Sequence, residues 1–220
     1  MSDRQAETID TVSHAKPRSI TPPYLLLRDF LAEETVAGLL DYALAHEPTF
    51  EPTKTGRFEG GEINPAVRIS LATRDLGPFK PILKSKVLSL VPDLIGKFGA
   101  TPVKAPKLEL QLVAHNEGAF YKRHIDAQTA SDSKNIRVLS GVYYFHAEPR
   151  AFTGGALRLH AIGGIRGEAF VDIEPVRNSL LVFPSWAPHE VMPVSCPSMR
   201  FIDSRFAINC WVHRLGDAAK

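Results

Sequence analysis

The chain has few cysteines and no long apolar run. Its 220 residues include only Cys196 and Cys210, too few for a disulfide framework. No stretch approaches the roughly 18 consecutive apolar residues of a membrane-spanning helix. The first twenty residues are polar and lack the apolar core of a signal peptide. We therefore expect a cytoplasmic protein with a flexible N-terminus at residues 1–20.

The chain also lacks a strong excess of either charge. The formal net charge is +2, and charged residues make up 23% of the chain, as in ordinary globular proteins. Proteins that bind nucleic acids or membrane surfaces usually carry a clear basic excess. We therefore expect neither nucleic acid nor membrane as a partner. The sequence leaves the oligomeric state open.

The first half of the chain predicts two helices. An apolar run at 24–30 predicts a short strand, and the pattern at 32–46 predicts an amphipathic helix. Residues 78–98 also favour a helix, interrupted at Pro92. Proline, glycine and charged residues concentrate at 47–67, which predicts a loop acting as a lid.

The second half of the chain predicts an all-β core. Short segments rich in β-branched and aromatic residues alternate with turn residues, at 107–115, 136–146, 154–160, 168–174, 178–184, 189–194 and 205–213. Strands of this number and spacing suit a double-sheet jelly roll. We expect a single domain at 21–220, mainly β, in which helical support (21–106) precedes a jelly-roll core (107–213).

The segment RHID places His124 and Asp126 two residues apart. In an extended segment both side chains point to the same side, with their Cα atoms roughly 7 Å apart. His189, at the start of the apolar segment HEVMPV, offers a third ligand. Two histidines and one carboxylate form the facial triad of non-haem Fe(II) oxygenases, although zinc accepts the same set. An H-x-D pair alone is more often a surface pair, so another feature must decide.

That feature is the segment RFAINCW. Strand alternation places Arg205, Ala207, Asn209 and Trp211 on one face and an apolar set on the other. The first face suits a pocket wall, because a buried guanidinium can hold a carboxylate through two hydrogen bonds. The alternative is an edge strand whose arginine faces solvent.

The chain resembles the Fe(II)/2-oxoglutarate-dependent dioxygenases. The resemblance lies in five motifs and their order, namely RHID, YYF followed by GGALR, VDIEP, PHEVMPV and RFAINCW. Within them the chain is most similar to the prolyl-4-hydroxylase-like branch, which includes the hypoxia-type prolyl hydroxylases. The resemblance covers about 107–213 and implies a double-stranded β-helix, a cupin-like jelly roll, supported by helices.

The resemblance also implies roles for single residues. It implies iron ligation by His124, Asp126 and His189, and binding of the far carboxylate of 2-oxoglutarate by Arg205 and Tyr144. O2 is then the cosubstrate, and ascorbate is an expected stimulant. The resemblance further points to Arg137 as a substrate contact, and the pocket-wall pattern adds Asn209 and Trp211.

The implied reaction is hydroxylation of a C–H bond with release of succinate and CO2. A prolyl residue in a peptide or protein is the expected substrate, and a free amino acid or small metabolite is the alternative. A different class of protein would be a non-oxidising metal-binding jelly roll or a zinc hydrolase. Arg205 and Tyr144 argue against that class, because a hydrolase needs no carboxylate clamp beside its metal.

The sequence departs from the family pattern in two places. Where some members have a tyrosine before the turn that leads to H-x-D, this chain has Ala114 and His115. We expect His115 to be structural and not a fourth iron ligand. A longer segment before RFAINCW contains Arg200, a rival to Arg205, which we prefer because its neighbours match the family. Gly154 and Gly155 predict a tight turn close to the site.

Overall fold

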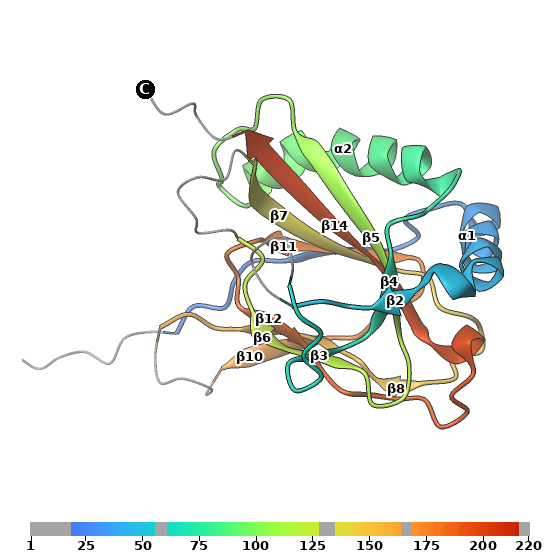
Figure 1. Cartoon of the computed structure of the whole chain (residues 1–220). Coiled ribbons are helices and arrows are strands. Elements are labelled where there is room, and N and C mark those ends of the chain that lie inside the picture. The colour runs from blue at the N-terminus through green and yellow to red at the C-terminus, as the bar shows by residue number, and fades with distance from the viewer. Residues whose placement is uncertain (1–18, 56–60, 128–134, 164–168, 216–220) are drawn as a thin grey trace, which may run out of the picture.

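The structure is a computed structural model that describes residues 19–55, 61–127, 135–163 and 169–215. This part of the chain forms three antiparallel sheets, two α-helices and two short 3-10 helices. Two larger sheets lie face to face, as Figure 1 shows. The prediction of a mainly β protein with few helices is therefore confirmed. No helix in the described ranges is long and apolar enough to cross a membrane.

The larger sheet is organised around its central strand β14 (Arg205–Leu215). The strand pairs along its length with β7 (Asn135–Tyr144) on one side and β5 (Lys107–His115) on the other. The remaining strands of this sheet are β11 (Ser179–Pro184) and β1 (Leu25–Leu27) beyond β7, and β4 (Leu71–Thr73) and β2 (Glu51–Pro52) beyond β5.

The second sheet has five strands and carries one wall of the site. Its order is β10 (Phe170–Ile173), β9 (Leu157–His160), β12 (His189–Val191), β6 (Phe120–His124) and β3 (Arg68–Ile69). A two-stranded sheet pairs β13 (Val194–Ser195) with β8 (Thr153–Gly154). Within the described residues, β3 is thus an edge strand that pairs with β6 alone.

The helices are α1 (Glu33–Ala45), α2 (Phe79–Lys97), η1 (Glu47–Thr49) and η2 (Phe201–Asp203). Figure 1 shows α2 lying across the outer face of the seven-stranded sheet. The predicted interruption at Pro92 is wrong, because α2 continues through it. Pro92 lies on the exposed side of the helix, where water can solvate the carbonyl that loses its N–H partner.

The apolar residues divide into two main clusters, one on each face of the large sheet. Phe206, Ile208 and Cys210 of β14 pack in the larger cluster, which includes the buried side of α2. Ala207 belongs to the smaller cluster between the two sheets. The predicted alternation of β14 is therefore confirmed, and its other face is free to line a cavity. Cys196 and Cys210 are buried free thiols.

All seven strands predicted after residue 107 are present, but two of them are divided. The segment 154–160 becomes β8 and β9, because Gly154 and Gly155 both have positive φ. The segment 189–194 becomes β12 and β13, with Pro193, which has no N–H to donate, between them.

The lid prediction at 47–67 stays a prediction. The described part of that segment contains η1, β2 and a bridge between Thr55 and Glu62. Residues 56–60, including Gly60, lie outside the described residues, as do residues 1–18 of the predicted flexible N-terminus.

Candidate active site

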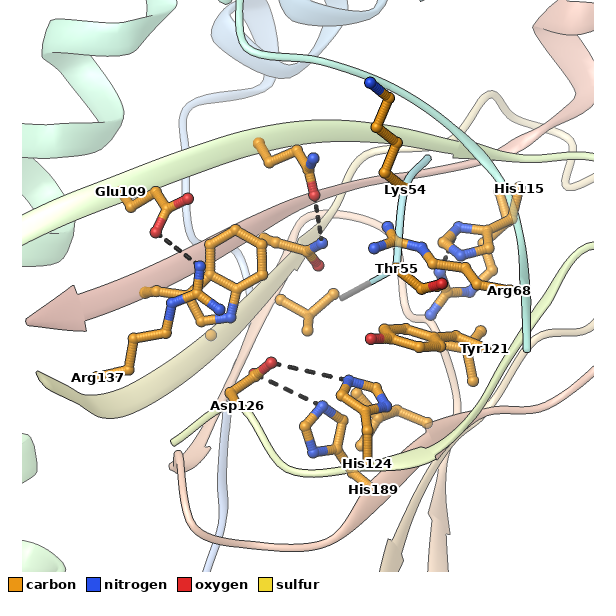
Figure 2. Close-up of a pocket in the computed structure, with 18 of the residues that line it drawn as sticks. Lys54, Thr55, Arg68, Glu109, His115, Tyr121, His124, Asp126, Arg137 and His189 are labelled. Carbon is orange, nitrogen blue, oxygen red and sulfur yellow. Dashed lines mark hydrogen bonds and ion pairs between the residues drawn. The ribbon is translucent and has the colours of Figure 1, made fainter. Parts of the chain in front are cut away.

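His124, Asp126 and His189 meet in the space between the two large sheets (Figure 2). His124 ends β6 and His189 begins β12, and the two are direct partners in the ladder. Asp126 follows β6, where its N–H donates to the carbonyl of Ser185 at 3.0 Å. The prediction of an extended H-x-D segment with a third ligand from a distant strand therefore matches the geometry.

The distances among these three side chains suit one small cation. The Nε2 atom of His124 lies 3.7 Å from Oδ1 of Asp126, and Nε2 of His189 lies 3.6 Å from Oδ2. Two ligands each about 2.1 Å from one ion are separated by roughly 3.0–3.5 Å. Only a small movement would bring the two Nε2 atoms and one carboxylate oxygen of Asp126 to bonding distance from a shared metal.

Hydrogen bonds fix both imidazoles with the correct nitrogen facing the centre. The Nδ1 atom of His124 donates to the carbonyl of Lys122 at 2.8 Å, and Nδ1 of His189 donates to that of Ala187 at 3.0 Å. Because Nδ1 carries the proton in each ring, the lone pair of Nε2 points toward Asp126. Such orienting bonds are typical of metal-ligating histidines.

The carboxylate of the cluster is held in its ionised form. The Ser140 hydroxyl donates to Oδ2 of Asp126 at 2.7 Å, and Ser140 in turn lies 2.9 Å from the Ser185 hydroxyl. Burial raises the pKa of Asp126, but the two histidines and the Ser140 hydrogen bond outweigh it, so the pKa lies below its ordinary value. Burial, followed by the effect of His189, lowers the pKa of His124. Metal binding requires these deprotonated forms.

Arg205 lines the same cavity and is buried, with 1% of its surface exposed. Its Nε donates to the carbonyl of Gly155 at 2.7 Å, and its Nη1 lies 3.3 Å from Nδ1 of His115. Within the described residues, its Nη2 has no hydrogen-bond partner, and neither does the buried hydroxyl of Tyr144. The two groups are close, since the guanidinium carbon lies 4.9 Å from the centre of the Tyr144 ring. A carboxylate would satisfy both donors.

Gly155 makes room for this arginine. Its φ is +71°, and a Cβ atom there would lie only 2.6 Å from Cδ of Arg205. Any other residue would therefore displace Arg205 as well as strain the backbone. The prediction of a glycine turn close to the site is confirmed.

His115 and Arg200, the two residues whose roles were in question, lie in different places. His115 is buried against Arg205 and outside the metal cluster. Burial, followed by the charges of Arg205 and Arg68, lowers its pKa, so it is neutral. Arg200 lies on the surface, where its guanidinium donates two hydrogen bonds to the carboxylate of Asp203, and it does not line the cavity.

The predicted substrate contacts Arg137, Asn209 and Trp211 all line the cavity. The Arg137 guanidinium lies over the Trp211 ring, 4.1 Å from its centre. Its Nη2 donates to Glu109 at 2.8 Å. Burial raises the pKa of Glu109, but His213, Arg137 and Arg74 lower it to about 2. Arg137 is therefore a fixed part of the cavity wall and not a solvated strand end.

Several lining residues were missed by the sequence reasoning. The cavity has a volume of about 230 Å³ and is also lined by Lys54, Thr55, Arg68, Glu109 and Tyr121. Tyr121 stacks on His124 with ring centres 3.7 Å apart. The sequence holds no signal for Tyr121, because strand alternation assigns a residue three positions before His124 to the opposite face; the register between β6 and β12 shifts in this stretch. Arg68 lies on a two-residue strand, which has no detectable periodicity.

Comparisons with known proteins agree with this geometry. The sequence profile of the 2OG-Fe(II) oxygenase superfamily matches residues 110–213. A protein of Synechocystis sp., named as an uncharacterized PKHD-type hydroxylase, is 30% identical over 212 residues, which cover 91% of this chain and 67% of that protein.

Solved structures show the same fold. A prolyl-4-hydroxylase of Pseudomonas putida has a TM-score of 0.64 at 23% identity, covering 89% of this chain and 95% of that one. A Trichoplax adhaerens prolyl hydroxylase, solved with a peptide of hypoxia inducible factor, has a TM-score of 0.64 at 21% identity, covering 87% and 83%. With a relative at this identity over most of both chains, and with a cluster fitted for one cation beside an unsatisfied arginine, the chain belongs to the 2OG-Fe(II) oxygenase superfamily and is an oxygenase that depends on Fe(II), 2-oxoglutarate and O2.

Proposed function

We propose that this oxygenase hydroxylates a prolyl residue of a peptide or protein and releases succinate and CO2. The observation that carries the proposal is Nη2 of Arg205, which has no partner among the described residues and belongs to a side chain that lines the same cavity as the His124–Asp126–His189 cluster, with the equally unpartnered Tyr144 hydroxyl close to it. The PKHD-type relative and the prolyl hydroxylases of similar fold support the choice of substrate.

In this proposal the three clustered residues hold the metal through Nε2 of each histidine and the carboxylate of Asp126. Bound iron, with 2-oxoglutarate and O2, supplies the oxidative chemistry that hydroxylates the C–H bond. Asp126 occupies a coordination position and remains unprotonated, since Ser140 donates to it. The two backbone carbonyls that accept from the imidazoles keep both rings from rotating.

Arg205 and Tyr144 orient the cosubstrate in this proposal. The guanidinium is fixed through Nε by Gly155 and through Nη1 by His115, so Nη2 can donate without first being ordered. The Tyr144 hydroxyl donates beside it. A carboxylate bound to both donors at one end of the cavity directs the rest of a short dicarboxylate toward the metal cluster.

We also propose that the two facing sheets form a double-stranded β-helix and that Arg137, Asn209 and Trp211 contact the substrate. These three lie on β7 and β14, on the cavity wall contributed by the large sheet. The stacking of Arg137 on Trp211 gives this wall a flat surface that suits a pyrrolidine ring.

The test is succinate release with Fe(II) and 2-oxoglutarate, measured against prolyl peptides, the same peptides with alanine for proline, and free amino acids. We expect prolyl peptides to stimulate succinate release and to gain one oxygen atom by mass spectrometry. The Asp126→Ala variant should be inactive, and Arg200→Ala, which changes a residue outside the cavity, should retain activity. Equal turnover with the alanine peptides would contradict prolyl specificity, and hydroxylation of a free amino acid alone would favour a small substrate.

A further inference from the structure

Arg68 is one of the four arginines that line the described part of the cavity, and neither the metal nor the cosubstrate has an evident use for it. It lies on edge strand β3, is only 9% exposed, and extends over the Tyr121 ring, 4.7 Å from its centre. Figure 2 shows its guanidinium pointing toward the middle of the cavity. Among the described residues, no acidic side chain forms an ion pair with it.

Among the described residues, the one hydrogen bond that the Arg68 side chain makes serves to position it. Its Nε donates to the Ser70 hydroxyl at 2.9 Å, and Ser70 is itself 2.9 Å from the Thr53 hydroxyl. This chain of bonds fixes the direction of the side chain. The terminal Nη1 and Nη2 groups donate to no described residue, so the two-pronged end of the guanidinium is available for an oxyanion.

Among the described residues, the charges around the cavity give Arg68 no counter-ion. Five cationic side chains line the described part of the cavity, namely Lys54, Arg68, Arg74, Arg137 and Arg205, against the two carboxylates of Asp126 and Glu109. Glu109 contacts Arg74 and Arg137, and Asp126 lies between the two clustered histidines. A divalent metal and a dicarboxylate would cancel each other, so the positive excess would remain in the loaded site.

Burial makes this excess costly. Burial lowers the pKa of Arg68, because its charged form loses hydration in the cavity. A bound anion would recover that loss, and it would gain from the low local dielectric. A buried arginine with no ligand to bind would be expected to have a carboxylate partner, as the partly buried Arg137 has in Glu109.

We infer that Arg68 binds a carboxylate of the substrate, so that the enzyme selects substrates with an anionic group near the reacting carbon. The inference rests on the proposed function and narrows it. Two sources can supply the group, namely an acidic side chain beside the prolyl residue or the α-carboxylate of a C-terminal or free proline. The shared chemistry is a carboxylate that meets the Arg68 guanidinium while the reacting carbon faces the metal cluster.

The experiment compares charged probes with uncharged probes of the same shape. Prolyl peptides with Asp or Asn on either side of proline form one arm, and L-proline with L-prolinamide forms the other. Binding is measured by calorimetry without oxygen, on enzyme loaded with Fe(II) and 2-oxoglutarate, and hydroxylation is measured separately. The wild type should bind the charged member of at least one pair about tenfold more tightly or better, as a charge-assisted hydrogen bond allows.

The variants assign that preference to Arg68. Arg68→Gln should remove it and leave 2-oxoglutarate affinity within about threefold, whereas Arg68→Lys should keep part of it. Arg200→Gln removes an equal charge outside the cavity and should change nothing. Thermal melting of Arg68→Gln checks that it folds, and the Lys variant serves if it does not.

The outcomes separate the inference from the proposed function. The inference is overturned if no charged probe binds with higher affinity than its neutral partner. It is also overturned if the preference for charged probes survives in Arg68→Gln. Loss of 2-oxoglutarate affinity in Arg68→Gln as large as in Arg205→Ala would assign Arg68 to the cosubstrate and also overturn it. Hydroxylation of prolyl probes regardless of their charge overturns the inference about Arg68 and leaves the proposed function in place. If charged probes bind more tightly through Arg68 but no prolyl probe is hydroxylated, the proposed substrate is wrong and the anion site remains.

Discussion

Replacing Arg205 with alanine should separate cosubstrate binding from metal binding. Arg205 is 1% exposed, so its pairing with a carboxylate takes place away from water. Truncating one partner of such a pair typically costs roughly 2–5 kcal/mol. At about 1.4 kcal/mol per tenfold change, the apparent affinity for 2-oxoglutarate should fall about 30-fold or more. Fe(II) affinity should barely change, because Arg205 is not one of the clustered ligands.

The assay is the apparent 2-oxoglutarate affinity at saturating Fe(II), measured on folded protein. Arg205→Lys should recover only part of the loss, because an ammonium cannot donate to Gly155 and to a carboxylate with the geometry of the guanidinium fork. Arg200→Ala is the matched control. Its parent arginine is paired with Asp203 outside the cavity, so its affinity should remain near that of the wild type.

Two results would refute this reasoning. If Arg200→Ala lost affinity and Arg205→Ala did not, the cosubstrate would bind outside the cavity described above. If neither variant lost affinity, the unpaired Nη2 of Arg205 would have another function, and the cosubstrate would be held elsewhere.

Three further predictions follow from the same contacts. Anaerobic titration should show one Fe(II) per chain, with tight binding lost in Asp126→Ala and His189→Ala; full occupancy in His124→Ala would contradict the assigned triad. Tyr144→Phe should weaken the binding of 2-oxoglutarate about tenfold. The free energy of unfolding of the ligand-free protein should stay the same or rise by up to about 1–3 kcal/mol, because the buried hydroxyl has no partner among the described residues. Affinity measurements check the first result and thermal melting the second. The pKa of Glu109 is about 2, below the ordinary 4.5, so its ion pairs stabilise the fold above pH 4.5 and lose that effect as the pH falls toward 2. Glu109→Gln should therefore cost on the order of 2 kcal/mol in urea unfolding at pH 7 and much less near pH 2, and an equal cost at both pH values would argue against it.

The features that could be predicted from the sequence depend on local alternation. Successive side chains of β14 point to opposite faces, one of them apolar and the other not. Arg205 and Trp211 could therefore be assigned to a cavity wall without knowing any strand partner. The H-x-D pair likewise needs only an extended backbone to bring its side chains together. His189 required more, since its place opposite His124 comes from the pairing of β12 with β6, but its position at the start of an apolar strand gave a sufficient signal.

The features that could not be predicted depend on register between distant strands. Glu109 meets Arg137 across the intervening strand β14, so no spacing along the chain reveals the contact. Strands β2, β3 and β4 have two or three residues each, too few for a periodic pattern. Arg68 was missed for this reason. The continuation of α2 through Pro92 depends on which side of the helix faces solvent, which follows from packing and not from the proline itself.

The cavity combines rigid positioning with incomplete satisfaction of its polar groups. Arg205 begins the central strand of the large sheet, where it is paired with His115 of β5, and from Ala207 onward the strand is also paired with β7. Its Nη2 and the Tyr144 hydroxyl nevertheless lack partners in the described structure, at a cost of roughly 1–3 kcal/mol for each buried group. A flexible site would relax to satisfy these donors internally, but the sheet prevents that movement. A ligand that supplies the acceptor therefore recovers a cost already present in the folded protein, and its binding requires little reordering of these side chains. The same reasoning applies to Arg68, whose direction is fixed by Ser70 and whose terminal donors face the cavity.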